Sequence, residues 1–342
     1  MATKRASTLE SILGHRWRRF VVGGLALLVL PFSLGTLIAS QILIYALFVM
    51  GYNLLLGYGG EMSFGHAAYF GLGAYGTVLG VQYLGNLYLA LGVGLLGAVC
   101  GGIIIGWFSL RRRGIYFSMI TLAFAQMLYF AAFSYTGITG GSNGASIPLD
   151  SQGVGPLDPG AGGLQFYAFV LLLVLLGWFS VRRVVNSPFG RILVSIRENE
   201  TRAQSLGYDT NRYLYISFVI SAFISGLAGV LYSLLFSLIT PNVLFWSLSG
   251  EVVLMAIIGG VGTLSGPFVG AGVFILLSEY LTQYFEVWGF VFGIVIVGFV
   301  MAAPEGIYGY FLNRTGTATG DTRRIDTLFL DWLPDWITER ID

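Results

Sequence analysis

The chain has 342 residues, of which 56% are hydrophobic and 10% are charged, with a formal net charge of +1 and one cysteine. Soluble domains carry about a quarter charged residues, and a soluble core does not grow enough to bury this much apolar surface. The charge gives no basic field for nucleic acid, and one cysteine excludes an intrachain disulfide or a cysteine-cluster metal site. We therefore expect an all-α, polytopic integral membrane protein with no metal, cofactor or nucleic-acid partner.

Windows of about 20 mostly apolar residues predict about ten transmembrane helices. They lie at 20–39, 41–58, 62–80, 87–109, 115–134, 164–181, 212–238, 248–262, 266–283 and 288–303. A cleaved signal peptide is an alternative for the first window, because Arg18 and Arg19 precede it. Its length and the span that follows at once favour an uncleaved helix.

Lys and Arg residues predict the orientation, because short cytoplasmic segments are enriched in them. They cluster in residues 1–19, 111–113, 182–212 and 314–324, and with ten spans all four clusters fall on one side. The segments assigned to the other side, around 81–86, 135–163, 239–247 and 284–287, contain neither residue. Both termini are thus predicted to be cytoplasmic, with segment 1–19 before a transmembrane domain at 20–303 and a tail at 304–342.

The cytoplasmic segment 182–211 carries an amphipathic pattern. Ser187 and Pro188 resemble a helix start, with Ser as a candidate cap, and Gly207 resembles a helix stop. One or two short helices are predicted between these points. They could form a simple interfacial connector with solvated charges, or a coupling helix that docks on a cytosolic ATPase. Neither the period nor the charge decides between the two.

Two glycine-rich passages interrupt apolar segments, one at Gly57–Gly60 and one at Gly259–Gly262. Broken helices at membrane depth occur only where protein or a water-filled cavity satisfies the backbone, so the breaks suggest a central pathway. A tight structural turn is the alternative for the first passage. No Lys-Ser/Thr follows the first passage, which excludes a phosphate loop.

The ionisable residues of the apolar region are few: Glu61, His66, Glu251 and Glu279. Such residues are functional candidates, although the Gly/Ala face that carries His66 favours a hydrogen bond to a neighbouring helix over a contact with solute. The pattern does not fit a proton relay, and no His-Glu-x-x-His or Gly-x-Ser-x-Gly motif supports an intramembrane enzyme. No catalytic residue is expected.

Five stretches together resemble the LivM type of branched-chain amino acid ABC permease. They are Gly51 to Tyr75, Arg113 to Gln126, Thr139 to Gly144, Ser187 to Asp209 and Glu251 to Gly272. The resemblance implies an importer in the cytoplasmic (inner) membrane, in which this subunit pairs with a second homologous permease. Two cytosolic ATPase subunits would drive the pair, and an extracytoplasmic solute-binding protein would deliver the solute.

The resemblance also implies roles for single residues. The ATPase-coupling residues would be Arg197, Glu198, Asn199, Glu200, Ala203 and Gly207. Residues near the translocation pathway would be Gly60, Ser63, Phe64, His66, Gly259 and Gly260. The tail after Pro304 departs from the family pattern, and its Leu328 to Ile337 stretch fits an interfacial helix or a frayed tail.

The expected function is therefore a permease subunit that hydrolyses nothing itself and imports branched-chain or related amino acids by alternating access. One alternative keeps the architecture and changes the solute to urea or short amides. Another is a channel or an ion-coupled secondary transporter, which would use Glu61, His66 and Glu251 and would need no docking helix.

Overall fold

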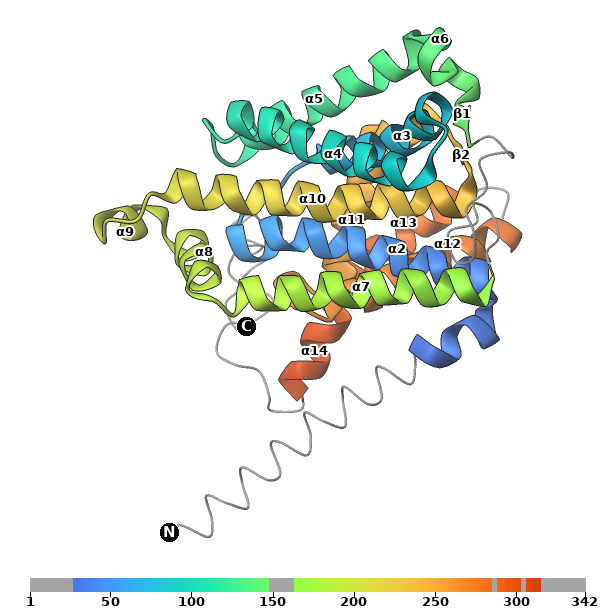
Figure 1. Cartoon of the computed structure of the whole chain (residues 1–342). Coiled ribbons are helices and arrows are strands. Elements are labelled where there is room, and N and C mark those ends of the chain that lie inside the picture. The colour runs from blue at the N-terminus through green and yellow to red at the C-terminus, as the bar shows by residue number, and fades with distance from the viewer. Residues whose placement is uncertain (1–26, 148–162, 285–287, 303–305, 315–342) are drawn as a thin grey trace.

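The computed structural model describes residues 27–147, 163–284, 288–302 and 306–314 (Figure 1). The described chain is helical apart from one short pairing of strands, in agreement with the all-α prediction. Segment 1–19, residues 148–162 of the external loop and the Leu328 to Ile337 stretch of the tail lie outside the described residues.

Residues 27–34 are helical and lead into the main elements. The long helices are α2 (Thr36–Asn53) with its π-helical continuation η1 (Leu54–Tyr58), α3 (His66–Leu84), α4 (Leu87–Ser109), α5 (Ile115–Ser134), α7 (Leu164–Val185), α10 (Thr210–Phe236), α11 (Trp246–Gly259), α12 (Gly266–Tyr284) and α13 (Trp288–Ala302). The short elements are α6 (Thr136–Thr139), η2 (Gly141–Asn143), β1 (Ala145–Ser146), α8 (Pro188–Glu198), α9 (Glu200–Ser205), β2 (Leu238–Ile239), η5 (Pro241–Leu244) and α14 (Gly306–Arg314). Helices α4 and α5 have the bounds predicted for them.

Helix α2 lies at the centre of the bundle. Its sequence is apolar all round, which is typical of a helix buried on every side, and most of its residues from Ala39 to Asn53 are buried. It packs against α7, α10, α11 and α12, while α3 packs against α4 and α10 (Figure 1). Helix α2 therefore contributes much of the internal core.

The outer helices expose large apolar side chains. Leu96 and Trp107 on α4, Tyr116 on α5 and Phe179 on α7 are each at least 60% exposed. Such a surface needs lipid around it. Five described helices are long and apolar enough to cross a membrane: Thr36–Tyr58, Leu87–Ser109, Ile115–Ser134, Leu164–Val185 and Thr210–Phe236. The count of ten spans and the cytoplasmic location of both termini stay predictions.

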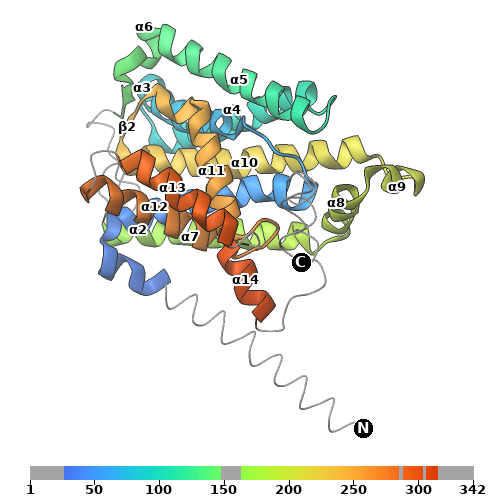
Figure 2. The ribbon, with the colours of Figure 1, turned by 180° about the vertical axis from the view of Figure 1, so that it is seen from behind.

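The two ends of the bundle differ in composition. At one end, which we call the arginine end, the α4–α5 connection with Arg111 to Arg113 lies near α8 and α9 (Figures 1 and 2). At the opposite end, the strand end, β1 pairs antiparallel with β2, with Ala145 opposite Ile239. The pairing ties the loop after α5 to the loop after α10.

The predicted boundary between the first two spans is wrong. The windows 20–39 and 41–58 place it at Ser40, but α2 begins at Thr36 and Ser40 is fully buried within it. The Ser40 hydroxyl donates to the carbonyl of Thr36 at 2.7 Å, as a serine inside a helix can. The break lies instead at Gly35, whose φ of 84° suits glycine and strains other residues.

Glycines let α3 and α10 approach at backbone distance. A Cβ atom at Gly73 would lie 2.2 Å from the carbonyl oxygen of Gly226, and one at Gly229 would lie 1.9 Å from that of Phe70. Small residues at helix interfaces are the usual means of close packing in membranes. The glycines of α3 and α10 therefore allow close contact between the two helices.

Candidate functional site

The amphipathic segment at the arginine end forms two helices, where the sequence predicted one or two. Helix α8 buries Leu193 and Ile196 and exposes Arg191 on its other face. Asn199 ends α8 in an extended conformation and caps α9, because its side-chain oxygen accepts from the backbone N–H of Arg202 at 2.8 Å. The chain then leaves α9 through Gly207 at φ 89°.

Ser187 does not cap α8 as its sequence position suggested. Its hydroxyl donates instead to the carbonyl of Val184 at 2.6 Å, at the end of α7. Pro188 still occupies the first turn of α8, where its missing N–H has no cost. The serine therefore joins the turn between α7 and α8.

The six predicted coupling residues divide into two groups. Glu198, Asn199 and Gly207 are exposed, whereas Ala203 is 2% exposed and packs in the core cluster beneath α9. The side chains of Arg197 and Glu200 turn toward the bundle.

The exposed tip of this segment carries two large side chains that sequence reasoning did not single out. Leu206 is 71% exposed and Tyr208 is 40% exposed, on either side of Gly207. Large apolar side chains on both sides of a glycine that ends a helix are the available signal for such a tip. The pair gives the arginine end an exposed apolar projection.

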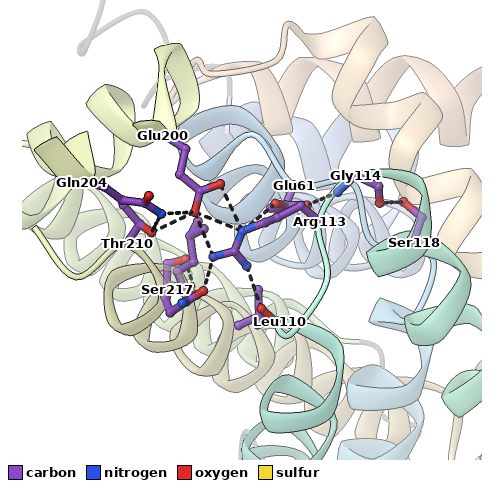
Figure 3. Close-up of polar contacts among 11 residues, drawn as sticks. Glu61, Leu110, Arg113, Gly114, Ser118, Glu200, Gln204, Thr210 and Ser217 are labelled. Carbon is purple, nitrogen blue, oxygen red and sulfur yellow. Dashed lines mark hydrogen bonds and ion pairs between the residues drawn. The ribbon is translucent and has the colours of Figure 1, made fainter. Parts of the chain in front are cut away.

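Glu200 is the centre of a polar network that fastens α9 to the bundle (Figure 3). Its carboxylate accepts from Arg113 at 3.2 Å and from the Thr210 hydroxyl at 2.8 Å. Burial alone would raise its pKa, but the hydrogen bonds from Arg113 and Thr210 outweigh burial, so the pKa of Glu200 lies below its usual value. The Arg113 guanidinium also donates to the carbonyl of Leu110, which fixes its position.

Glu61 extends the same network to the connection between η1 and α3. It lies 3.6 Å from the Nε atom of Arg113 and accepts from the backbone N–H of Gly114 at 3.2 Å. Burial raises the pKa of Glu61 to about 7, although Arg113 and Gly114 act in the opposite direction. Arg113 therefore bridges two carboxylates that are 139 positions apart in the chain (200 − 61).

The two glycine-rich passages meet at the arginine end, in what we call the glycine junction: Asn53, Gly57, Gly60, Gly262 and Thr263. A Cβ atom at Gly57 would lie 2.5 Å from the backbone nitrogen of Gly262. The amide of Asn53, which is 3% exposed, donates to the carbonyl of Thr263 at 2.8 Å and accepts from the N–H of Gly262 at 2.9 Å. Asn53 was not among the predicted site residues, and its position inside a buried apolar helix was the signal.

The helix form at the junction is unusual. Residues Leu54–Tyr58 form a π-helix, and Gly60 follows with a φ of 77°. Short π-helical turns are rare and often occur at functional positions. The backbone carbonyl of Gly57 accepts a hydrogen bond from Nη1 of Arg197, so α8 reaches the junction directly.

The other predicted pathway residues lie along the start of α3 and between α11 and α12. Ser63 is buried, and the N–H of Phe64 donates to the Thr121 hydroxyl at 3.2 Å. Gly259 and Gly260 let α11 turn closely into α12, since a Cβ atom at Gly259 would lie 2.1 Å from the Gly266 carbonyl.

His66 is fully buried between α3, α2 and α10. Its Nε2 lies 2.7 Å from the hydroxyl of Ser221, which itself donates to the Gly51 carbonyl at 2.6 Å. Because the serine proton is used there, we assign the imidazole proton to Nε2. The sequence had predicted a hydrogen bond from His66 to a neighbouring helix, because His66 lies on a Gly/Ala face.

Helix α14 lies where the sequence predicted only a tail. Gly306, at φ 73°, comes so close to the end of α11 that a Cβ atom added there would lie 2.5 Å from the backbone nitrogen of Gly260. Helix α14 also packs against α12. The part of the tail that the structure describes thus packs beside the α11–α12 turn.

Comparison with known proteins gives a consistent result over most of the chain. A family model described as "Branched-chain amino acid transport system / permease component" matches residues 36–300. The high-affinity branched-chain amino acid transport system permease protein LivM of Escherichia coli strain K12 is 29% identical over 311 residues, covering 82% of this chain and 73% of that protein. No solved structure matches.

More distant relatives include both types of permease. LivH of Salmonella typhimurium is 26% identical over 285 residues, which cover 78% of this chain and 91% of that protein. A probable LivM of Methanocaldococcus jannaschii is 26% identical over 279 residues, covering 70% of this chain and 79% of that protein.

Proposed function

Because this chain belongs to the branched-chain amino acid transport permease family, we propose that it is one of two related permease subunits of an importer for branched-chain or related amino acids. As a permease component it is a transport subunit and not the ATPase. Separate cytosolic ATPase subunits would supply the energy, and an extracytoplasmic binding protein would deliver the solute. The complex would reside in the cytoplasmic (inner) membrane.

The observation that carries this proposal is the construction of the segment 182–211. Helices α8 and α9 bury Leu193 and Ile196, and Glu200 fastens α9 to Arg113 at 3.2 Å. A surface that must pass force to the bundle needs such rigid attachment. Its exposed side then offers Leu206, Tyr208 and the polar residues around Glu198 to a partner groove.

The opposite end would receive the binding protein. The described part of the loop after α5 is tied to the loop after α10 by the β1–β2 pairing. Neither loop carries Lys or Arg between 135 and 163 or between 239 and 247. A basic rim on the partner would therefore meet no like charge from these loops.

The ion-coupled alternative gains little from the ionisable residues. Glu61 is engaged with Arg113 and Gly114, and His66 is hydrogen-bonded to Ser221. Two of the three residues that a secondary transporter would use thus make contacts that hold the described fold together. The ATP-driven mechanism needs neither of them to bind an ion.

The test is uptake of labelled leucine into proteoliposomes that contain this chain, its permease partner, the ATPases and the binding protein. We expect uptake to need both ATP and binding protein. The variant Leu206→Asp should lose the ATPase on purification and lose uptake, whereas Leu238→Asp, an equally polar change at the strand end, should retain the ATPase. Uptake of urea in place of leucine would change the solute and keep the architecture. Solute flux through this chain alone, without ATP, would refute the proposal.

A further inference from the structure

Arg197 lies in the last turn of α8, and its side chain points toward the bundle and away from the exposed face of the helix. Its Nη1 donates to the Gly57 carbonyl, and its Cγ would be 2.8 Å from a Cβ atom built at Gly60. The same Nη1 would be 3.4 Å from a Cβ atom at Gly262. One side chain therefore binds the first glycine-rich passage and lies beside the second.

The contact is directional, unlike the packing of the rest of α8. Leu193 and Ile196 are buried apolar residues that can slide against their neighbours, whereas a guanidinium bound to a carbonyl holds one geometry. Gly57 in turn lies against Gly262, whose N–H is held by Asn53. A displacement of α8 must then either break the Arg197–Gly57 bond or move the junction.

Glycine makes the junction able to follow such a movement. Gly60 and Gly262 have φ values of 77° and 75°, a region open to glycine and strained for other residues. Because these glycines have no Cβ atoms, the backbones of the two passages can approach each other and the Arg197 side chain closely. Hinges are commonly a few such positions at the ends of elements.

We propose that Arg197 is a positioning residue that transmits the movement of α8 to the glycine junction, and so connects ATPase docking to the rearrangement of the bundle. This inference rests on the proposed function and changes the role that the family resemblance implied for Arg197. The arginine acts inward on Gly57, and other residues of α8 and α9 meet the ATPase.

The experiment compares Arg197→Ala, Arg197→Lys and the control Arg112→Ala in the complete reconstituted complex. Arg112 is an exposed arginine of the α4–α5 connection, at the same end of the bundle and outside the segment 182–211. We expect Arg197→Ala to purify with its full complement of ATPase and to continue hydrolysing ATP. Its solute uptake per ATP should fall about tenfold, as expected for the loss of one charge-assisted hydrogen bond. Lysine can still donate to Gly57, so Arg197→Lys should recover part of the uptake, and Arg112→Ala should match the parent.

A second measurement does not depend on the solute. Cys100 is replaced by Ser and a reporter cysteine is introduced as Val261→Cys, beside Gly262. The rate of maleimide labelling should change on addition of a non-hydrolysable ATP analogue, and Arg197→Ala should abolish that change. Loss of the ATPase from purified Arg197→Ala, equal losses of hydrolysis and uptake, or an unaltered labelling response would each overturn the inference. Failure of the parent to take up solute would count against the proposed function, while the labelling response would still decide the role of Arg197.

Discussion

Asn53 and Gly262 are joined by a hydrogen bond from the backbone N–H of Gly262 to the side-chain oxygen of Asn53, at 2.9 Å and 209 residues apart in sequence. The same amide donates to the Thr263 carbonyl at 2.8 Å. One side chain thus closes the turn between α11 and α12 against α2.

Replacing this amide should loosen the turn. Asn53→Leu keeps a similar volume but leaves the Gly262 N–H and the Thr263 carbonyl without that partner, which costs roughly 1–3 kcal/mol for each unsatisfied buried group. We expect a lower thermal midpoint for the purified complex and reduced uptake. The exposed Asn186, whose side chain donates to the Arg182 carbonyl in its own turn, provides the control variant Asn186→Ala. An equal loss of stability there would contradict the prediction.

The close approach of α3 and α10 predicts a strong effect of one added methyl group. Gly229→Ala would place a Cβ atom 1.9 Å from the Phe70 carbonyl, so the helices must separate. Overpacking of this kind costs about 1–3 kcal/mol. Thermal unfolding in detergent should show the loss for Gly229→Ala. Gly92→Ala adds a methyl where nothing lies within 4 Å and should leave the midpoint unchanged or slightly raised. Similar midpoints for both variants would refute the packing argument.

The carboxylate of Glu200 makes attachment of α9 dependent on pH. Its pKa in the folded chain lies below its usual value, because the bonds from Arg113 and Thr210 outweigh burial. Its stabilising contribution is therefore fully present above the unfolded pKa and is lost as the pH falls through the folded pKa. Protease cleavage within 199–209 should accelerate in acid for the parent chain.

The matched variant for that measurement is Glu200→Gln, which cannot titrate. It should be cleaved faster than the parent at neutral pH, and the difference between the two should shrink as the parent becomes protonated. A parent and variant that show the same pH profile would exclude Glu200 as the titrating group.

The stability contributed by Glu61 should depend on pH in the opposite direction to that of Glu200. Burial raises its folded pKa to about 7 from 4.5, so the folded chain holds the proton more tightly than the unfolded chain between these values. The buried carboxylate then costs stability as the pH rises toward 7, by roughly 1–3 kcal/mol. Glu61→Gln resembles the protonated form and can still accept from Gly114. Its thermal midpoint relative to the parent should rise between pH 5 and pH 8, and a constant difference would contradict this assignment.

Much of the fold could be read locally. Apolar runs gave the bounds of α4 and α5, since a span needs only a continuous apolar length. Arg111 to Arg113 and the arginines of 182–212 were assigned to one side, and the structure brings Arg113 to Glu200 at one end of the bundle. Gly207 marked a helix stop because glycine tolerates the positive φ that the chain adopts there.

The break at Gly35 was missed because Ser40 is equally acceptable in a helix or at a boundary when its neighbours are unknown. The meeting of Gly57 with Gly262, the bonds of Asn53 across it and the inward path of Arg197 depend on contacts between residues far apart in the chain. The charge of the segment and the spacing of its apolar residues are the same whether an arginine on α8 faces a partner protein or a backbone carbonyl. Sequence by itself thus determined the bounds of α4 and α5 and which end of the bundle is charged, since these follow from local composition. Only the tertiary structure decided what the charged and polar side chains hold, because that depends on which backbones lie within hydrogen-bond reach.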